Sequence, residues 1–234
     1  MSNNIDQCIL KLKFDRPLSR NVKAKDLRGA IANYNKDNRL FHQHTTDGEP
    51  IYKYPLVQYK IIKGEGFLVG FNEGAKTITN LEILNERFEF CAEKYILLQN
   101  ELIFHSNPIG TNKEFLHYHF LSLWLALNEE NYQKYMRMDK QEKNQLLSKI
   151  LIGNILSMSK GLEYVVTEEI KASSLDVHEV PARLKGVPMI GFMGKFKVNF
   201  EIPDYLGIGK SVSRGFGTVK KINDMLHDDG APDI

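Results

Sequence analysis

The sequence is poor in cysteine and contains no long apolar run. Its 234 residues include only Cys8 and Cys91, too few for a disulfide framework or a cysteine-based zinc site. No stretch approaches the roughly 18 apolar residues that a membrane-spanning helix needs. The N-terminus also lacks the charged-then-apolar pattern of a signal peptide. These absences predict a cytoplasmic globular protein with no membrane partner, made of one large domain or two small ones.

Acidic residues are missing from one stretch near the C-terminus. Residues 206–222 carry four basic side chains and no acid, whereas residues 1–60 carry 11 Lys/Arg against 6 Asp/Glu. The tail, 223–234, has four aspartates and no Lys or Arg, and the whole chain has a net charge of +2. Two basic segments far apart in sequence can form one electropositive surface, which suits a polyanion. Ordinary solvated charge accounts for the pattern equally well.

Hydrophobic periodicity in the first half predicts a ferredoxin-like unit. Residues 7–18 alternate as a half-buried strand does. The apolar face comprises Cys8, Leu10, Leu12 and Phe14, and the polar face comprises Lys11 and Lys13. Helices are predicted at 21–35 and from Asn72, as the N-cap, to about Phe88; strands are predicted at 56–62, 67–71 and 95–104. This order, β-α-β-β-α-β, is that of the ferredoxin-like split βαβ unit.

The second half begins the same order again but does not complete it. Strand-like patterns occur at 115–127, 162–170 and 189–202, and helical patterns at 129–136 and 139–159. The long helix has an apolar stripe of Leu146, Leu147, Ile150, Leu151 and Ile155; the last strand alternates Phe196, Val198, Phe200 and Ile202 with Lys195, Lys197 and Asn199. We therefore predict an α+β fold of two tandem ferredoxin-like (RRM-like) domains, at 1–108 and 109–234. The second domain is incomplete, with a glycine-rich loop in place of its last helix.

The glycine-rich segment LGIGKSVSRGFGTV, residues 206–219, has the chemistry of an anion site. Its glycines alternate with cations and hydroxyls, and glycine lets backbone amides approach an anion closely. The segment matches neither a P-loop nor a dinucleotide-binding motif. Its RGFG begins like the RNP1 motif of an RRM, but Thr218 and Lys220 stand where aromatic residues should stack on bases. A flexible hairpin loop is the plainer interpretation; we favour a phosphate backbone as the ligand.

The glycine pattern of residues 207–219, after a predicted β-hairpin, resembles that of the CRISPR-associated repeat-processing endoribonucleases. These enzymes belong to the RNA-binding repeat-associated mysterious protein (RAMP) superfamily. The likeness spans the whole chain in the order of its elements, and residues 41–59 share a weaker likeness with one branch of the family. That branch has a His-x-His pair after the first helix, followed by a tyrosine, as His42, His44 and Tyr52 are arranged here.

The resemblance implies a metal-independent endoribonuclease that needs no cofactor. Members of the family cut precursor CRISPR RNA within each repeat. The 2′-hydroxyl attacks the adjacent phosphate and leaves a 2′,3′-cyclic phosphate and a 5′-hydroxyl. Repeat RNA is then the expected partner, with a second copy of the chain and other CRISPR effector subunits as further candidates. We predict RNA contacts at Gly207, Gly209, Lys210, Ser211, Ser213, Arg214, Gly215, Gly217, Lys195 and Lys197.

Two histidines suit the acid–base chemistry of this reaction. Imidazole titrates near neutral pH, so one histidine can accept the proton of the 2′-hydroxyl while the other protonates the leaving 5′-oxygen. In an extended segment His42 and His44 point the same way, roughly 7 Å apart, and can straddle one phosphate. Lys53 can supply positive charge, and Tyr52 or Tyr54 can orient the phosphate or stack on a base. We predict a catalytic group of His42, His44, Tyr52 and Lys53.

Other interpretations of the histidines stay open. Zinc needs three or four ligands, so the pair forms a metal site only if His117 and His119 come close to it. We expect no metal, and we expect His117 and His119 to share the polar face of a strand, with Tyr118 pointing away. Surface decoration is a further interpretation. A non-catalytic RNA-binding subunit of a CRISPR effector complex is the main alternative function, and an acyl- or nucleotide-binding α+β protein is a more distant one.

Overall fold

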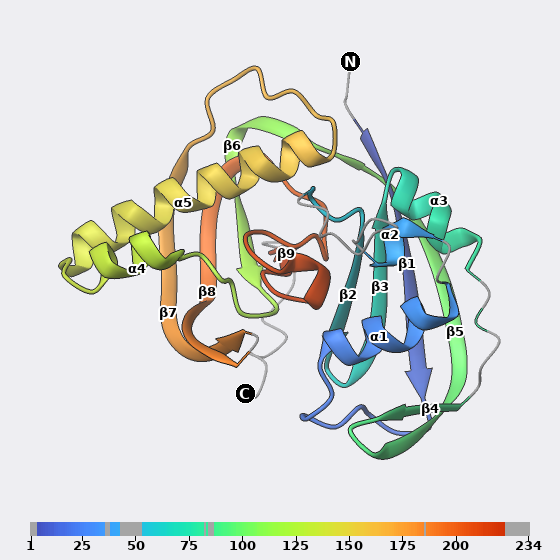
Figure 1. The fold of residues 1–234 in the computed structure, drawn as a ribbon. Helices are drawn as coiled ribbons and strands as arrows, with labels where there is room; N and C mark the ends of the chain where they lie inside the picture. Colours follow the sequence, from blue (N-terminus) through green and yellow to red (C-terminus); the bar gives the residue numbers. More distant parts are fainter. Residues whose placement is uncertain are drawn as a thin grey trace. The chain divides into compact units, whose positions relative to one another are not determined.

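The structure is a computed structural model that describes residues 4–35, 38–42, 53–81, 83, 87–184 and 186–222. Its contacts divide the chain into two compact units. The N-terminal unit contains Asn4–Asn107 and, from far along the chain, Val212–Gly215. The C-terminal unit contains Pro108–Ser211 and Phe216–Ile222 of the described chain. Figure 1 shows the helices and strands of both units.

The described part of the N-terminal unit contains a five-stranded sheet with helices packed on it. Its elements are β1 (Asn4–Phe14), α1 (Ala24–Tyr34), α2 (Arg39–His42), β2 (Val57–Ile62), β3 (Glu65–Phe71), α3 (Glu73–Thr79), β4 (Arg87–Phe90) and β5 (Glu93–Pro108). The sheet order is β2-β3-β1-β5-β4, so β2 forms one edge. Strands β1, β2, β3 and β5, with α1 and α3, confirm the predicted β-α-β-β-α-β order.

The predicted faces of β1 are confirmed. Cys8, Leu10, Leu12 and Phe14 lie in a core shared with α1 and α3, while Lys11 is half-buried and Lys13 exposed. The helix predicted from Asn72 to about Phe88 is wrong at its C-terminal end, because α3 stops at Thr79 and β4 follows. Phe88 and Phe90 alternate with charged residues and are buried, and their rings pack edge-on against Phe14 at 5.5 and 6.0 Å. A period of two in apolar burial is the pattern of a strand.

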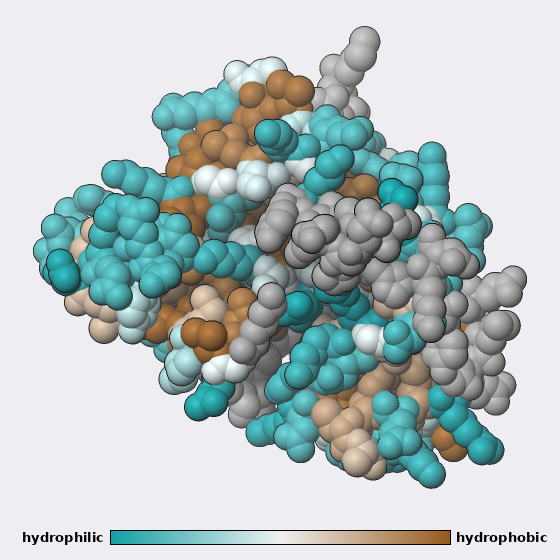
Figure 2. Space-filling view, viewed as in Figure 1, coloured by the Kyte–Doolittle hydropathy of each residue, from teal (hydrophilic) through white to brown (hydrophobic). Residues whose placement is uncertain are grey.

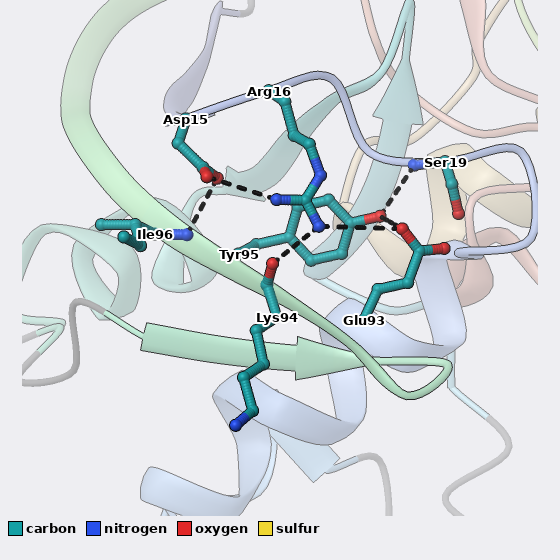
Figure 3. Close-up of polar contacts among 7 residues, drawn as sticks. All are labelled: Asp15, Arg16, Ser19, Glu93, Lys94, Tyr95 and Ile96. Carbon is teal, nitrogen blue, oxygen red and sulfur yellow. Dashed lines mark hydrogen bonds and ion pairs between the residues drawn. The ribbon is translucent and has the colours of Figure 1, made fainter.

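A cluster of polar contacts fixes the segment that leads into α1 (Figure 3). The Arg16 guanidinium lies 4.4 Å from the centre of the Tyr95 ring and donates to the Lys94 carbonyl at 2.8 Å. The Tyr95 hydroxyl accepts from the Ser19 backbone N–H at 3.1 Å and donates to the Glu93 carboxylate at 3.1 Å. Because Ser19 lies a few residues before α1, these contacts tie the start of that helix to β5.

The C-terminal unit has a four-stranded sheet and one long helix. Its elements are β6 (Gly110–Phe120), α4 (Glu129–Tyr135), α5 (Lys140–Gly161), β7 (Ala172–Leu184), β8 (Val187–Glu201) and β9 (Val219–Lys221). The sheet order β7-β8-β6-β9 repeats, strand for strand along the chain, the β2-β3-β1-β5 order of the N-terminal unit. The two sheets confirm the α+β fold of tandem ferredoxin-like units. Between β8 and β9 the chain forms only the short 3₁₀ helix η1 (Val212–Arg214).

The long helix α5 begins with a capping box and packs on the sheet. The Asp139 carboxylate accepts from the Glu142 backbone N–H at 2.9 Å, and the Glu142 carboxylate accepts from the Asp139 N–H at 3.0 Å. Leu147, Leu151 and Ile155 of the predicted stripe are buried. Figure 1 shows α5 running across β7 and β8, and Figure 2 shows a hydrophilic surface over α4 at the left of the same view. No described helix, α5 included, is long and apolar enough to cross a membrane.

The strand predictions in this unit need correction at three places. Strand β6 ends at Phe120, so residues 121–127 of the strand predicted at 115–127 lie outside it. Residues 162–170, predicted as a strand, form turns and irregular chain. The apolar residues of this segment do not form a buried face, since the side chain of Val165 is 76% exposed. Strand β7 follows from Ala172 and is not predicted at all, because Pro181 and several charged residues interrupt any regular alternation in its sequence. It pairs antiparallel with β8 along its length in a long hairpin.

Candidate nucleic-acid interface

Three glycines of the glycine-rich segment pack tightly inside the C-terminal unit. Gly207 bridges to Thr218, and the Ile208 N–H donates to the Gly217 carbonyl at 2.8 Å. Gly217 has a φ of +63°, and a Cβ there would collide with the Ile208 carbonyl. A Cβ on Gly209 would lie 2.8 Å from the indole nitrogen of the single tryptophan. These contacts hold together the two ends of the loop, residues 207–209 and 217–218, which we call its neck. The glycines here therefore have a packing reason of their own.

The predicted phosphate contact Lys210 is partly used to hold the loop. Its Nζ donates to the Leu127 carbonyl at 2.9 Å, and its backbone N–H donates to the Leu125 carbonyl at 3.4 Å. Partial burial lowers the pKa of Lys210. An ammonium has three N–H donors, so the bond to Leu127 leaves donors for an anion. The predicted hydroxyls of Ser211 and Ser213 are half-buried on either side of Val212.

The tip of the loop, η1 with Gly215, belongs to the N-terminal unit and packs against α1 and β2. Gly215 has a φ of +85°, and a Cβ there would lie 2.8 Å from Ala24 Cβ and 3.1 Å from the Tyr59 carbonyl. A residue with a side chain would therefore need both an unfavourable backbone conformation and a displaced tip. Gly215 thus lets the loop approach the start of α1 and the edge strand β2.

The loop tip brings Arg214 close to a second arginine, Arg28 of α1. Burial lowers the pKa of the Arg28 guanidinium, the nearby Tyr59 phenol raises it, and the positive charge of Arg214 lowers it further. Both arginines are half-exposed. Two like charges that influence each other at a partly exposed surface are suited to an anion that contacts both.

The helix that carries the first candidate histidine is anchored to Tyr59, a neighbour of Arg28. Phe41 of α2 is 2% exposed, and its carbonyl accepts a long hydrogen bond of 3.5 Å from the Tyr59 hydroxyl. The backbone of His42 belongs to α2, so the extended conformation predicted for this residue is wrong. The side chain of His42 and the whole of His44 and Tyr52 lie outside the described residues. Tyr59 therefore connects the position of α2 with that of Arg28.

The other side chains predicted near the histidines have different environments. Lys53 is exposed. The Tyr54 hydroxyl accepts from Gln58 Nε2 at 2.9 Å, and burial raises its pKa. Gln58 Oε1 in turn accepts from Lys60 Nζ at 3.0 Å. Lys60 is 1% exposed, and burial lowers its pKa to about 7. Tyr54 is thus held in a polar chain that ends at a buried lysine.

The polar face of the C-terminal sheet carries a row of basic side chains. Strand register places Lys197 opposite His117, and Lys195 opposite His119. On its other side, His119 lies opposite Lys220 of β9. Direct cross-strand neighbours share a face, with Cβ atoms about 5 Å apart. Tyr118 is fully buried on the opposite face, as predicted. This row can extend an anion path across the sheet.

No group of three or more His, Cys, Asp or Glu side chains is placed to hold a metal ion in the part of the chain that the structure describes. His117 and His119 lie in β6 with lysines as their cross-strand neighbours. Metal ligation by these two histidines would need partners other than lysine, which is positively charged at neutral pH.

Family comparison identifies the chain. Residues 3–107 match the Cas6b N-terminal domain, and residues 110–222 match the Cas6b C-terminal domain. The chain belongs to the Cas6b family. This membership confirms, at the level of the family, the resemblance predicted from the glycine-rich segment.

Solved Cas6b structures share the fold of this Cas6b chain. One crystal structure of Cas6b is 33% identical, with a TM-score of 0.86 over 94% of this chain and 100% of that one. A second, a CRISPR RNA processing endoribonuclease Cas6b, is 34% identical, with a TM-score of 0.75 over 93% of this chain and 100% of that one. An uncharacterized protein of Methanocaldococcus jannaschii is 50% identical over 115 residues, which are 49% of this chain and 78% of that protein.

Three residues around the Cas6b loop tip are absent from the predicted site. Arg28 lies in an ordinary amphipathic helix, and Tyr59 and Lys60 lie in a strand whose residues on both faces are buried. Nothing local distinguishes them, because their neighbours come from a loop near the other end of the chain. The burial of a lysine in a strand is visible in the sequence only as a cation inside an apolar run.

Proposed function

We propose that this Cas6b chain is an endoribonuclease that cleaves CRISPR repeat RNA in precursor transcripts without a metal ion. The observation that carries the proposal is the anchoring of α2 through the Phe41 carbonyl to Tyr59, which neighbours Arg28, itself under the influence of Arg214. This brings the end of the histidine-bearing helix toward a pair of cations that suit a phosphate group. A Cas6b relative of 34% identity is a CRISPR RNA processing endoribonuclease, which supports the same function.

The reaction would be a transesterification within the RNA. One histidine of the pair His42 and His44 accepts the proton of the 2′-hydroxyl, and the 2′-oxygen then attacks the adjacent phosphorus. The other histidine protonates the departing 5′-oxygen. The products are a 2′,3′-cyclic phosphate and a 5′-hydroxyl. Tyr52 and Lys53 would support the pair by orienting the phosphate and by placing positive charge near its developing negative charge.

RNA binding would use the loop and the polar face of the C-terminal sheet. Arg214 and the remaining donors of Lys210 would contact phosphates, with Ser211 and Ser213 as further donors. The packing of Gly207, Gly209 and Gly217 would shape the loop that presents these donors, and Gly215 would seat its tip. Lys195 and Lys197, in the row with His117 and His119, would continue the path.

The test is cleavage of a panel of CRISPR repeat RNAs in EDTA, followed by analysis of the product ends. We expect one cut per cognate repeat and a cyclic phosphate at the new 3′ end. Replacing the 2′-hydroxyl before the cut by hydrogen should abolish cleavage while leaving binding nearly intact. Dependence on a divalent ion, or cleavage of the 2′-deoxy RNA, would refute this mechanism. Binding of repeat RNA without any cleavage would favour the alternative, a non-catalytic RNA-binding subunit.

A further inference from the structure

The loop tip and α1 approach each other closely at one place. The position of a Cβ on Gly215 is 2.8 Å from Ala24 Cβ, so the two backbones are in contact there. Residues four apart on a helix lie one above the other on the same face. Arg28 therefore stands one turn above the contact at Ala24, and Arg214 precedes Gly215 in the loop. The backbone geometry thus places the two arginines in neighbouring elements of the N-terminal unit.

The two guanidiniums influence each other electrostatically. Both lie in the N-terminal unit, both are half-exposed, and the charge of Arg214 disfavours the charged form of Arg28. A ligand with negative oxygens on more than one side relieves the repulsion by contacting both groups. Guanidinium presents paired N–H donors that match the oxygens of a phosphate, so a phosphodiester fits this arrangement.

We propose that Arg28 and Arg214 form a clamp for one phosphate of the RNA, at or next to the bond that is cut. This inference rests on the proposed function, since the identity of the RNA comes from there. The clamp lies beside the cut because Tyr59, which neighbours Arg28, also bonds the Phe41 carbonyl at the end of the histidine helix. Arg28 contacts the phosphate directly from α1, and Arg214, from a loop far along the chain, completes the clamp.

The clamp predicts a specific coupling between an arginine and one phosphate. Binding would be measured with a repeat RNA that carries a 2′-deoxy nucleotide before the cut, and with variants that carry a single neutral methylphosphonate at each position near it. For the wild type, one methylphosphonate should weaken binding by on the order of tenfold or more. For Arg28→Ala or Arg214→Ala, binding of the unmodified RNA should fall by a similar factor. The same methylphosphonate should then have almost no further effect.

Matched variants separate the clamp from general charge and from folding. The variant that combines Arg28→Ala and Arg214→Ala should bind RNA only slightly less tightly than the single variant with the lower affinity, because both arginines contact one phosphate. Arg28→Lys keeps the charge but loses the paired donors, and should recover only part of the affinity. Lys76→Ala removes an exposed cation from α3 of the same unit and should keep the methylphosphonate pattern of the wild type. Thermal unfolding of each variant identifies losses that come from misfolding.

The outcomes distinguish the clamp from the proposed function. The clamp would be overturned if the loss of binding caused by Arg28→Ala simply added to the loss caused by each methylphosphonate. It would also be overturned if a folded Arg28→Ala variant bound RNA as well as the wild type. RNA cleavage by the wild type without any coupling would keep the proposed function and remove the clamp. Coupling at one phosphate in a protein that never cuts RNA would keep the clamp and remove the nuclease.

Discussion

The two units of this Cas6b chain repeat one strand order but complete it differently. In the N-terminal unit the helix α3 follows β3, the third strand of the repeat. It lies close to the sheet, because a Cβ on Gly70 of β3 would collide with the Gly74 carbonyl of the helix. In the C-terminal unit the corresponding stretch, between β8 and β9, contains only η1. The tip of that stretch packs on the N-terminal unit instead. The same fold thus has a covering helix in one half and, in the other, a loop whose tip packs on α1 and β2.

This difference indicates a division of roles. The N-terminal unit would hold the candidate histidines and Arg28, and the loop would deliver Arg214 to them. The C-terminal unit would contribute the neck of the loop and the basic row on its sheet. Changes in the histidines should then affect the chemical step, and changes in the neck should affect the stability of the C-terminal unit.

The largest effect is expected from the histidines. His42→Ala or His44→Ala should slow single-turnover cleavage by about 10²–10⁴-fold, because each would remove a positioned acid or base. Affinity should change only a few-fold. For the wild type, the single-turnover rate should be bell-shaped in pH and centred near neutrality, and each variant should lose one limb. A flat profile between about pH 5 and 9 would remove both histidines from the chemistry.

The neck of the loop should be sensitive to a single methyl group. Gly217→Ala combines a φ of +63° with a collision at the Ile208 carbonyl, and should lower the free energy of unfolding by about 3 kcal/mol. Gly186→Ala is the matched control, because its φ is +84° but nothing lies within 4 Å of its Cβ. It should cost only about 1 kcal/mol. Equal losses in denaturant unfolding would show that the close approach at the neck is unimportant.

Lys60 should make the N-terminal unit less stable at neutral pH than at alkaline pH. Its pKa is about 7 in the folded protein, against an ordinary value of 10.5. The unfolded chain therefore binds more protons between these values, and stability from this group rises as the pH rises from 7 to 10.5. Lys60→Met should raise the free energy of unfolding by about 2 kcal/mol at pH 7 and by much less at pH 10. The same gain at both pH values would mean that Lys60 is charged in the fold.

The smallest effects come from two exposed helical glycines, one in each unit. Gly29 of α1 and Gly153 of α5 have nothing within 4 Å of a Cβ, so alanine should stabilise each helix by roughly 0.5–1 kcal/mol. The single tryptophan, Trp124, is buried in the C-terminal unit, so its fluorescence reports that unit. Gly153→Ala should raise the midpoint of the fluorescence transition by about 2–4 °C. Gly29→Ala should leave it unchanged; an equal shift would mean that the units unfold together.

The fold could be predicted where one face of an element is buried. The alternation in β1 and β8 and the stripe of α5 follow from burial against a single neighbour, and the structure has them as expected. Strand β7 could not be predicted, since it is stabilised by pairing with β8 and its side chains carry little pattern. The end of α3 was also out of reach, because the switch to β4 depends on the packing of Phe88 and Phe90 against Phe14.

The candidate site could be predicted only where its residues are close in sequence. The glycine-rich segment stands out by composition, and Arg214 is part of it. The sequence does not show why each of these positions is glycine. At Gly217 a side chain would collide with a carbonyl of the same loop, and at Gly215 it would collide with α1. Arg28 has no local signal, since its partner Arg214 follows almost the whole chain later. The roles of His42 and His44 stay predictions.

The loop tip lies against β2, the strand at the edge of the N-terminal sheet. A ribosome completes Asn4–Asn107 before it reaches Val212, about 100 residues later. At roughly 5–20 residues per second this delay is about 5–20 s. An uncovered strand edge is a template for pairing with other chains. During translation the β2 edge is therefore without this loop for that interval, in which it can pair with neighbouring nascent chains.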